Sequence, residues 1–161
     1  MHTHRSVAFS SVLFLLCIAP TCLLAAGETD ACKVLTAAQV GAAIGVQVAA
    51  GTHVTPTFVR TCTWNASGSS PVKFVTLYLQ TVAAYDGGKQ MATQMAAAVK
   101  GASMKHAAIG DDGYYFVAGD QVGLLVKKGN ISFKAAVYAR LPVEQKEALE
   151  LALAKEALAK L

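Results

Sequence analysis

The chain has 161 residues, of which 54% are hydrophobic and 15% are charged, and its formal net charge is only +4. A surplus this small, spread along the chain, excludes nucleic acid as an expected partner. Once an N-terminal targeting segment is set aside, the remaining length fits one domain with a single core.

Residues 1–26 are predicted to be a signal peptide. A mildly basic start that includes Arg5 precedes an apolar run over residues 7–19, and Ala25, Ala26 and Gly27 offer small residues for cleavage. The apolar run is too short for a comfortable membrane span, and no later stretch approaches about 20 uninterrupted apolar residues. We therefore expect residues 27–161 to form a single exported domain, periplasmic or secreted, without a membrane span.

The chain has four cysteines, and Cys17 and Cys22 lie in the targeting segment. Cys22 follows a threonine rather than the small residue that lipidation needs, so a lipid anchor is the minor alternative. The remaining pair, Cys32 and Cys62, is predicted to form a disulfide, because export implies an oxidising compartment. Closing this loop would stabilise the fold by about 3–4 kcal/mol and clamp the first helix onto a sheet.

A short first helix is predicted between Thr36 and Gly45. Thr36 and Gln39 have the spacing of a capping box, and Gly45 supplies a left-handed stop. Because the helix has only about two to three turns, packing and the Cys32 tether must hold it in place.

Five strands and two further helices follow along the chain. The strands are expected at residues 58–65, 72–82, 114–118, 121–127 and 131–139. Between the second and third strands, Asp86 is expected to cap a helix that runs to about Val99, with Met91, Met95 and Val99 as its apolar stripe. Pro142 opens a terminal helix whose charges surround it, so it packs either on the domain or on a partner.

This order, α-β-β-α-β-β-β-α, indicates a two-layer α+β fold with an antiparallel sheet of about five strands and with the helices on one face. The other face would be open to solvent. Alternation from the disulfide places Phe58, Cys62 and Trp64 on the covered face. The open face is then expected to present Thr61, Thr63, Thr76, Tyr78, Gln80, Ser132, Lys134 and Tyr138, with Arg140 at its rim.

Four segments carry a family resemblance: CKVLTAAQVGAAIG (32–45), CTW (62–64), AIGDDGYYF (108–116) and LLVKKGN (124–130). With them the chain resembles exported bacterial domains of unknown function, many of which are actinobacterial lipoproteins. The arrangement is also similar to the extracellular sensor domain of a mycobacterial serine/threonine kinase. The shared motifs are structural and bring no catalytic residue, and this chain departs from the family by lacking a good lipidation cysteine. The resemblance implies a binding or sensing module in the envelope.

The open sheet face is the candidate binding site. Tyrosines flanked by cations can bind an acidic group or the surface of a partner, although solvated sheets routinely carry the same residue types. We therefore expect a non-enzymatic binding or sensing module without a cofactor, whose partner is an unknown envelope protein or a small ligand. The residues expected to bind are Tyr78, Gln80, Lys134, Tyr138 and Arg140.

Two alternatives use other residues. Soft thioether and imidazole ligands at Met91, Met95, Met104 and His106 would suit Cu(I), but a Met pair four residues apart is also an ordinary core filler. A small hydrolase would need a nucleophile, a base and an orienting group, and no GxSxG elbow is present. The adjacent carboxylates at residues 111 and 112 are flanked by glycines and are interpreted as turn formers.

Overall fold

A computed structural model describes residues 29–161, so the predicted signal peptide lies outside the described residues. Its helical elements are η1 (Ala31–Lys33), α1 (Ala37–Ile44), α2 (Val82–Ala98) and α3 (Val143–Leu158). Its strands are β1 (Thr52–His53), β2 (Thr61–Asn65), β3 (Val72–Gln80), β4 (Ala102–His106), β5 (Asp112–Ala118), β6 (Gln121–Lys128) and β7 (Ile131–Ala139).

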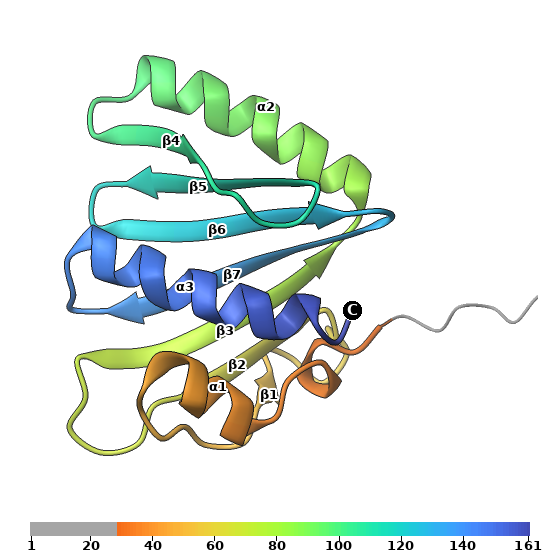
Figure 1. Cartoon of the computed structure of the whole chain (residues 1–161), viewed down its shortest axis with the longest axis vertical. Helices are drawn as coiled ribbons and strands as arrows, with labels where there is room; N and C mark the ends of the chain where they lie inside the picture. Colours follow the sequence, from red (N-terminus) through yellow and green to blue (C-terminus); the bar gives the residue numbers. More distant parts are fainter. Residues whose placement is uncertain (1–28) are drawn as a thin grey trace, which may run out of the picture.

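The strands form one antiparallel sheet in the order β1-β2-β3-β7-β6-β5-β4 (Figure 1). The α+β class is therefore confirmed, whereas the expectation of about five strands is wrong, because the described sheet has seven. The missed strands are short β1 and edge strand β4. The sequence of β4, ASMKH, has no β-branched residue. Its extended form comes from pairing with β5, in which Ala102 lies opposite Ala118 and His106 lies opposite Tyr114.

Helix α1 forms as its local sequence predicts. The Thr36 hydroxyl accepts a hydrogen bond from the Gln39 amide at 3.2 Å, and the Gln39 side chain accepts one from the Thr36 amide at 3.0 Å. Gly45 ends the helix at φ 70°, where a residue with a Cβ would be strained. The Cys32–Cys62 disulfide is present, with 4.9 Å between the Cα atoms, and ties the start of the domain to β2.

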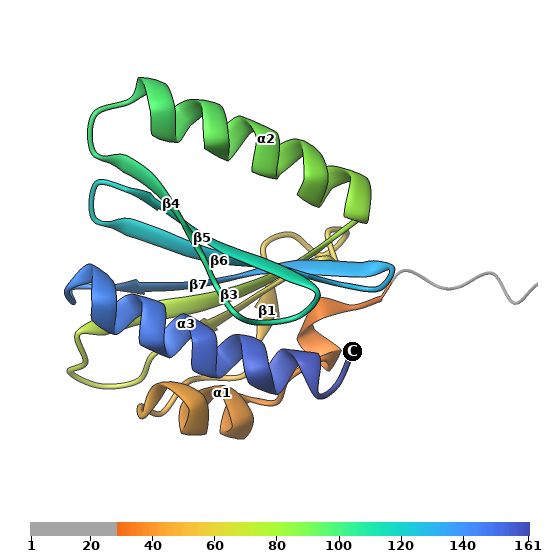
Figure 2. The ribbon, with the colours of Figure 1, turned by 45° about the horizontal axis from the view of Figure 1, so that its top comes forward.

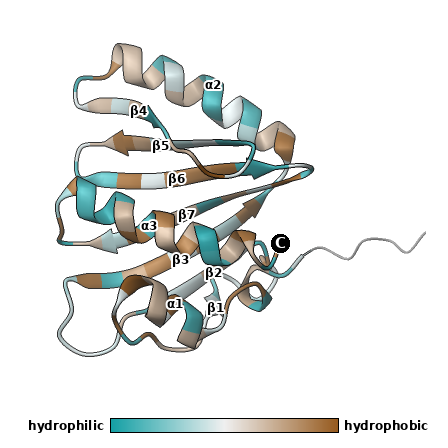
Figure 3. Ribbon diagram, viewed as in Figure 1, coloured by the Kyte–Doolittle hydropathy of each residue, from teal (hydrophilic) through white to brown (hydrophobic). Residues whose placement is uncertain are grey.

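Helices α1 and α3 cover one face of the sheet, and the main core lies beneath them (Figure 2). Figure 3 shows the apolar stretches that run along the central strands of the sheet. Gly51 packs so closely on this core that an added Cβ would lie 2.7 Å from the indole nitrogen of Trp64. The largest fully buried apolar side chains of the core are Trp64, Phe133, Leu35, Leu77, Leu124 and Leu153.

Helix α3 packs on this domain, against β6, β7 and α1. Leu153, Ala154 and Ala157 are fully buried, and three charged residues of the same helix are also buried. Each charged residue has a polar contact. Lys146 donates to the Asp120 carbonyl, Glu147 pairs with Lys105 at 2.6 Å, and Glu150 accepts from the Val137 amide at 3.0 Å.

Helix α2 lies on the opposite face of the sheet, which corrects the expectation that all helices share one face (Figure 2). Its buried residues, Tyr85 and Ala92, pack on Tyr114 in a second, smaller cluster. Neighbouring residues of β5 alternate, so Tyr115 faces the main core while Tyr114 faces α2. The face that was expected to be open is therefore partly covered by α2, which packs over β4 and β6 and reaches β7.

The start and the apolar stripe of α2 also differ from expectation. Thr81, not Asp86, is the N-cap, and its hydroxyl accepts from the Ala84 amide at 3.1 Å. The expected stripe of Met91, Met95 and Val99 is not buried: these side chains are 63%, 37% and 49% exposed. The aromatic ring of Tyr85 and the small side chain of Ala92 allow closer packing than the long methionines.

Phe58 was assigned to the covered face, and this assignment is wrong. Strand β2 begins only at Thr61, so the alternation does not extend back to residue 58. The Phe58 ring is 44% exposed and stacks on Tyr78, with 6.1 Å between the ring centroids. Cys62 and Trp64 do lie in the main core, as expected.

Candidate functional site

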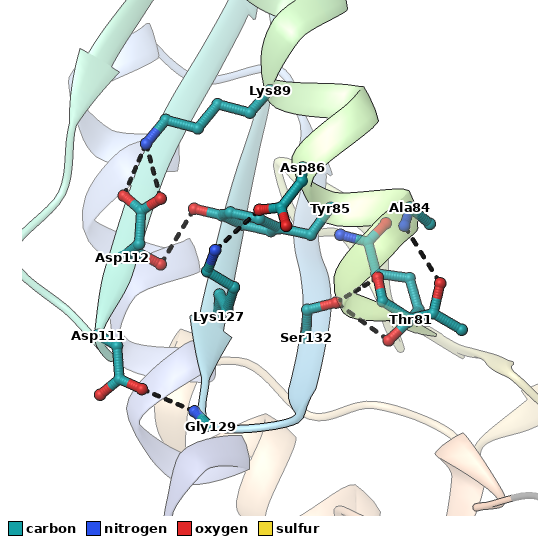
Figure 4. Close-up of polar contacts among 11 residues, drawn as sticks. Thr81, Ala84, Tyr85, Asp86, Lys89, Asp111, Asp112, Lys127, Gly129 and Ser132 are labelled. Atoms are coloured by element: carbon teal, nitrogen blue, oxygen red, sulfur yellow. Dashed lines mark hydrogen bonds and ion pairs between the residues drawn. The ribbon is translucent and has the colours of Figure 1, made fainter.

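The N-terminal half of α2 is anchored to the sheet by polar contacts around one aromatic ring (Figure 4). The Tyr85 hydroxyl donates to the Asp112 carbonyl at 3.1 Å, and its ring packs edge-to-face on Tyr114 at 5.5 Å. The Ser132 hydroxyl lies 3.0 Å from the carbonyls of Gln80 and Thr81, directly before the helix. Burial raises the pKa of Tyr85, so the ring remains neutral and the hydroxyl remains a donor.

Two ion pairs fix the same part of the helix. Lys89 contacts both carboxylate oxygens of Asp112, at 2.6 and 2.8 Å, and Lys127 contacts Asp86 at 2.8 Å (Figure 4). The Lys89 ammonium lowers the pKa of Asp112, and the hydrogen bond to Asp86 raises the pKa of Lys127. Both pairs are partly exposed, so they position the helix more than they stabilise the fold.

The C-terminal half of α2 leaves a groove against the sheet. This α2 groove has a volume of about 460 Å³ and lies between the helix and the ends of β5, β6 and β7. Such a volume is within the range of small-molecule sites. Its main side chains are Met91, Met95, Phe116, Leu125, Lys134 and Tyr138. The exposed methionines of α2 are therefore one wall of a concave apolar surface.

Two glycines leave space in the groove. Gly88 lines the groove from α2, and a Cβ added there would lie 3.7 Å from the hydroxyl of Tyr114. The absence of a side chain at this position therefore leaves space between the helix and Tyr114. On the floor, an added Cβ at Gly123 would lie 2.5 Å from Cε of Lys134, so the lysine side chain lies over Gly123 and would have to shift if this residue carried a side chain. Lys134 is half-buried, and it makes no hydrogen bond or ion pair within residues 29–161.

The structure brings two of the five predicted binding residues, Lys134 and Tyr138, together in the α2 groove. Tyr138 stacks on Phe74, with 4.2 Å between the ring centroids, and Tyr78 lies opposite Lys134 across the β3–β7 ladder. These rings extend the floor of the groove as a shelf on the uncovered part of the sheet. Arg140 follows β7 and is exposed.

The remaining predicted residue, Gln80, lies at the far end of β3, opposite Ser132. It is half-buried, and its amide nitrogen has no hydrogen-bond partner among the described residues. Ser132 was expected on the open face, but it is only 1% exposed because it fastens the start of α2. Gln80 thus lies outside the α2 groove, in a separate hollow beside Thr81 and Ser132.

The residues weighed for catalysis are not assembled into one cleft in the described part of the chain. The Asp111 carboxylate accepts from the Gly129 amide at 2.6 Å, which supports its interpretation as a turn former. Asp112 pairs with Lys89, and the ring of His53 lies 2.7 Å from Asp30. The bond to His53 lowers the pKa of Asp30. His106 is exposed on the edge strand β4.

Two groups of potential metal ligands are present. Asp30, Cys32 and His53 offer atoms within 4.8 Å of one another, but the Cys32 sulfur is in a disulfide and is not a thiolate ligand. In the second group, Met91 and Met95 line the α2 groove, whereas Met104 packs against the Tyr85 cluster below α2. Met91 and Met95 thus share one surface, while Met104 and His106 of β4 are not among the residues that line it.

Sequence reasoning missed Glu150, the most perturbed carboxyl group of the described chain. It is fully buried, one oxygen accepts from the Val137 amide, and the other has no partner among the described residues. Burial raises its pKa to about 8, against the opposing effects of backbone hydrogen bonds and of the Lys134 charge. A glutamate in a terminal helix of mixed charge gives no sequence signal of this environment.

No protein-family model, curated protein or solved structure matches this chain. The resemblance to exported actinobacterial domains therefore stays a prediction. Within residues 29–161, the structure has no helix with the length and apolar character of a membrane span.

Proposed function

We propose that this protein is an exported, non-enzymatic binding module that holds its ligand in the α2 groove. The groove carries the proposal because it is concave and mainly apolar, and because Met91 and Met95 are exposed along it. Methionine side chains adapt to varied apolar surfaces, and they are common at binding sites that accept different shapes. The tyrosines of the adjacent shelf offer further contact area for a larger partner.

The lining of the groove supports binding rather than catalysis. The described side chains that form it include no histidine, cysteine, serine or carboxylate that could act as nucleophile or general base. The disulfide fits an oxidising compartment, and the predicted signal peptide agrees with a periplasmic or secreted location.

Adjacent glycines in α2 allow a matched test. Gly88→Leu would place a side chain in the groove, whereas a Cβ at Gly87 meets no atom within 4 Å. Both changes replace glycine by a better helix former, so both proteins should fold. The wild type and Gly87→Leu are expected to retain a species from an extract of envelope lipids and small molecules, detected by native mass spectrometry. Equal retention by Gly88→Leu, or none by the wild type, would contradict the proposal.

A soft-metal site at Met91, Met95, Met104 and His106 is the second candidate function. It is favoured by the presence of three methionines on or beside the groove, with His106 two residues beyond Met104 in β4. Labelling the methionine methyl groups with ¹³C and titrating with Ag(I), a stable analogue of Cu(I), tests it. Shifts of all three methyl signals that saturate at one equivalent would favour the metal function over the organic ligand.

A further inference from the structure

We infer that the ligand of the α2 groove is a small amphipathic acid, with its anionic head on Lys134 and its apolar tail beneath Met91 and Met95. This inference rests on the proposed binding function and names the chemical class of its ligand. The class follows from the distribution of charge in the groove, from the contacts of Lys134 and from the space that the glycines leave.

Lys134 is the only charged side chain among the described residues that line the groove. The nearby cations are already paired: Lys89 contacts Asp112 at 2.6 Å, and Lys127 contacts Asp86 at 2.8 Å. Lys134 has no such partner within residues 29–161, although it is half-buried. A partly desolvated ammonium without an anion favours an anionic ligand group, and a charge-assisted hydrogen bond is stronger than a neutral one.

The rest of the groove suits an apolar tail. Phe116 and Leu125 line it from the sheet, and Met91 and Met95 line it from α2. Gly123 leaves the lysine head free to lie across the floor, since a Cβ there would displace its Cε. A volume of about 460 Å³ holds a molecule of roughly ten to twenty non-hydrogen atoms, as in other small-molecule sites. A short single-chain acid therefore satisfies charge, polarity and size together.

The charges on the opposite face of the sheet also favour an anionic ligand in the groove. Glu150, beneath the sheet, is the carboxyl group that interacts electrostatically with Lys134, and its burial disfavours the ionised form. With Glu150 neutral, the positive charge of Lys134 is not compensated from below. Glu147 is the other carboxylate near Glu150, and it is paired with Lys105.

Three probes of equal chain length test the charge preference: decanoate, decan-1-ol and decyltrimethylammonium. The protein, labelled with ¹³C at its methionine methyl groups, reports binding at Met91 and Met95, and calorimetry gives the affinities. We expect decanoate to bind about tenfold tighter than decan-1-ol, and the cation to bind most weakly. Lys134→Met should remove the preference for decanoate, whereas Lys155→Met, an exposed lysine of α3, should preserve it.

The outcomes separate the ligand class from the groove itself. Equal binding of decanoate and decan-1-ol, blocked by Gly88→Leu, would overturn the acid while leaving the groove as a binding site. A preference for decanoate that survives Lys134→Met would also overturn the assignment of the head group. Absence of any shift at Met91 and Met95 with all three probes would overturn both proposals and favour a protein partner on the tyrosine shelf.

Discussion

Lys134 and Glu150 lie on opposite faces of the sheet and interact electrostatically where β6 and β7 part. The ladder between these strands ends at Leu124 and Ala135, although both strands continue beyond it. On the α3 side, the Glu150 carboxylate takes the place of a strand partner for the Val137 amide. On the α2 side, the Lys134 side chain crosses Gly123. Lys134 on the α2 face and Glu150 on the α3 face therefore lie near the same end of the β6–β7 ladder.

Glu150 is expected to make folding stability depend on pH. Its folded-state pKa is about 8 and its ordinary value is 4.5, so the folded protein binds more protons between these values. The free energy of unfolding should therefore fall by roughly 3–5 kcal/mol as the pH rises from about 4.5 to 8, and level off above. Urea unfolding from pH 5 to pH 9 measures this dependence.

Glu150→Gln is the direct comparison, because the amide keeps the acceptor for the Val137 amide without a charge. This variant should lose most of the decline and should be more stable than the wild type at pH 8. Exposed Glu156→Gln on the same helix is the control. Lys134→Met should move the inflection to higher pH, since the lysine charge favours the carboxylate. Parallel pH curves for the wild type and Glu150→Gln would show that Glu150 titrates normally.

The disulfide is expected to contribute about 3–4 kcal/mol to the free energy of unfolding, because it closes a loop between residues 30 positions apart. Cys32→Ser with Cys62→Ser should lose this amount while retaining the fold, as α1 has its own capping box and packs against α3. Intact mass, with and without reduction and alkylation, verifies the bond. Two free thiols in oxidised, exported protein would remove the basis of the prediction.

Local signals were sufficient where a few neighbouring residues decide the structure. The capping box of Thr36 and Gln39 needs only contacts within α1, and it is present as predicted. Thr81 carries the same type of signal, but assigning residues 81 and 82 to the preceding strand hid it and left Asp86 as the apparent cap. The strand alternation of β3 and β7 also predicted correctly that Lys134 and Tyr138 face away from the main core.

The face chosen by α2 could not be predicted from local sequence. Its longest apolar side chains, Met91 and Met95, indicated a buried stripe, but burial followed the better fit of Tyr85 against Tyr114 and Asp112. Those partners are at least 27 residues away in sequence, so their proximity depends on sheet order. The α2 groove results from this placement, and it was missed for the same reason.

Trp64→Ala and Tyr78→Ala are expected to separate the two faces of the sheet. Trp64 is fully buried in the main core, so its truncation should cost roughly 3–5 kcal/mol of unfolding free energy through the cavity it leaves. Tyr78 is half-buried on the shelf, where it stacks only loosely on exposed Phe58, and its truncation should cost about 1 kcal/mol. Urea unfolding of both variants measures the difference.

The Tyr78→Ala variant should also have a weaker affinity, by about 1–2 kcal/mol, for a partner that binds on the shelf. The two-face assignment would fail if Tyr78→Ala unfolded the protein while Trp64→Ala left its stability unchanged.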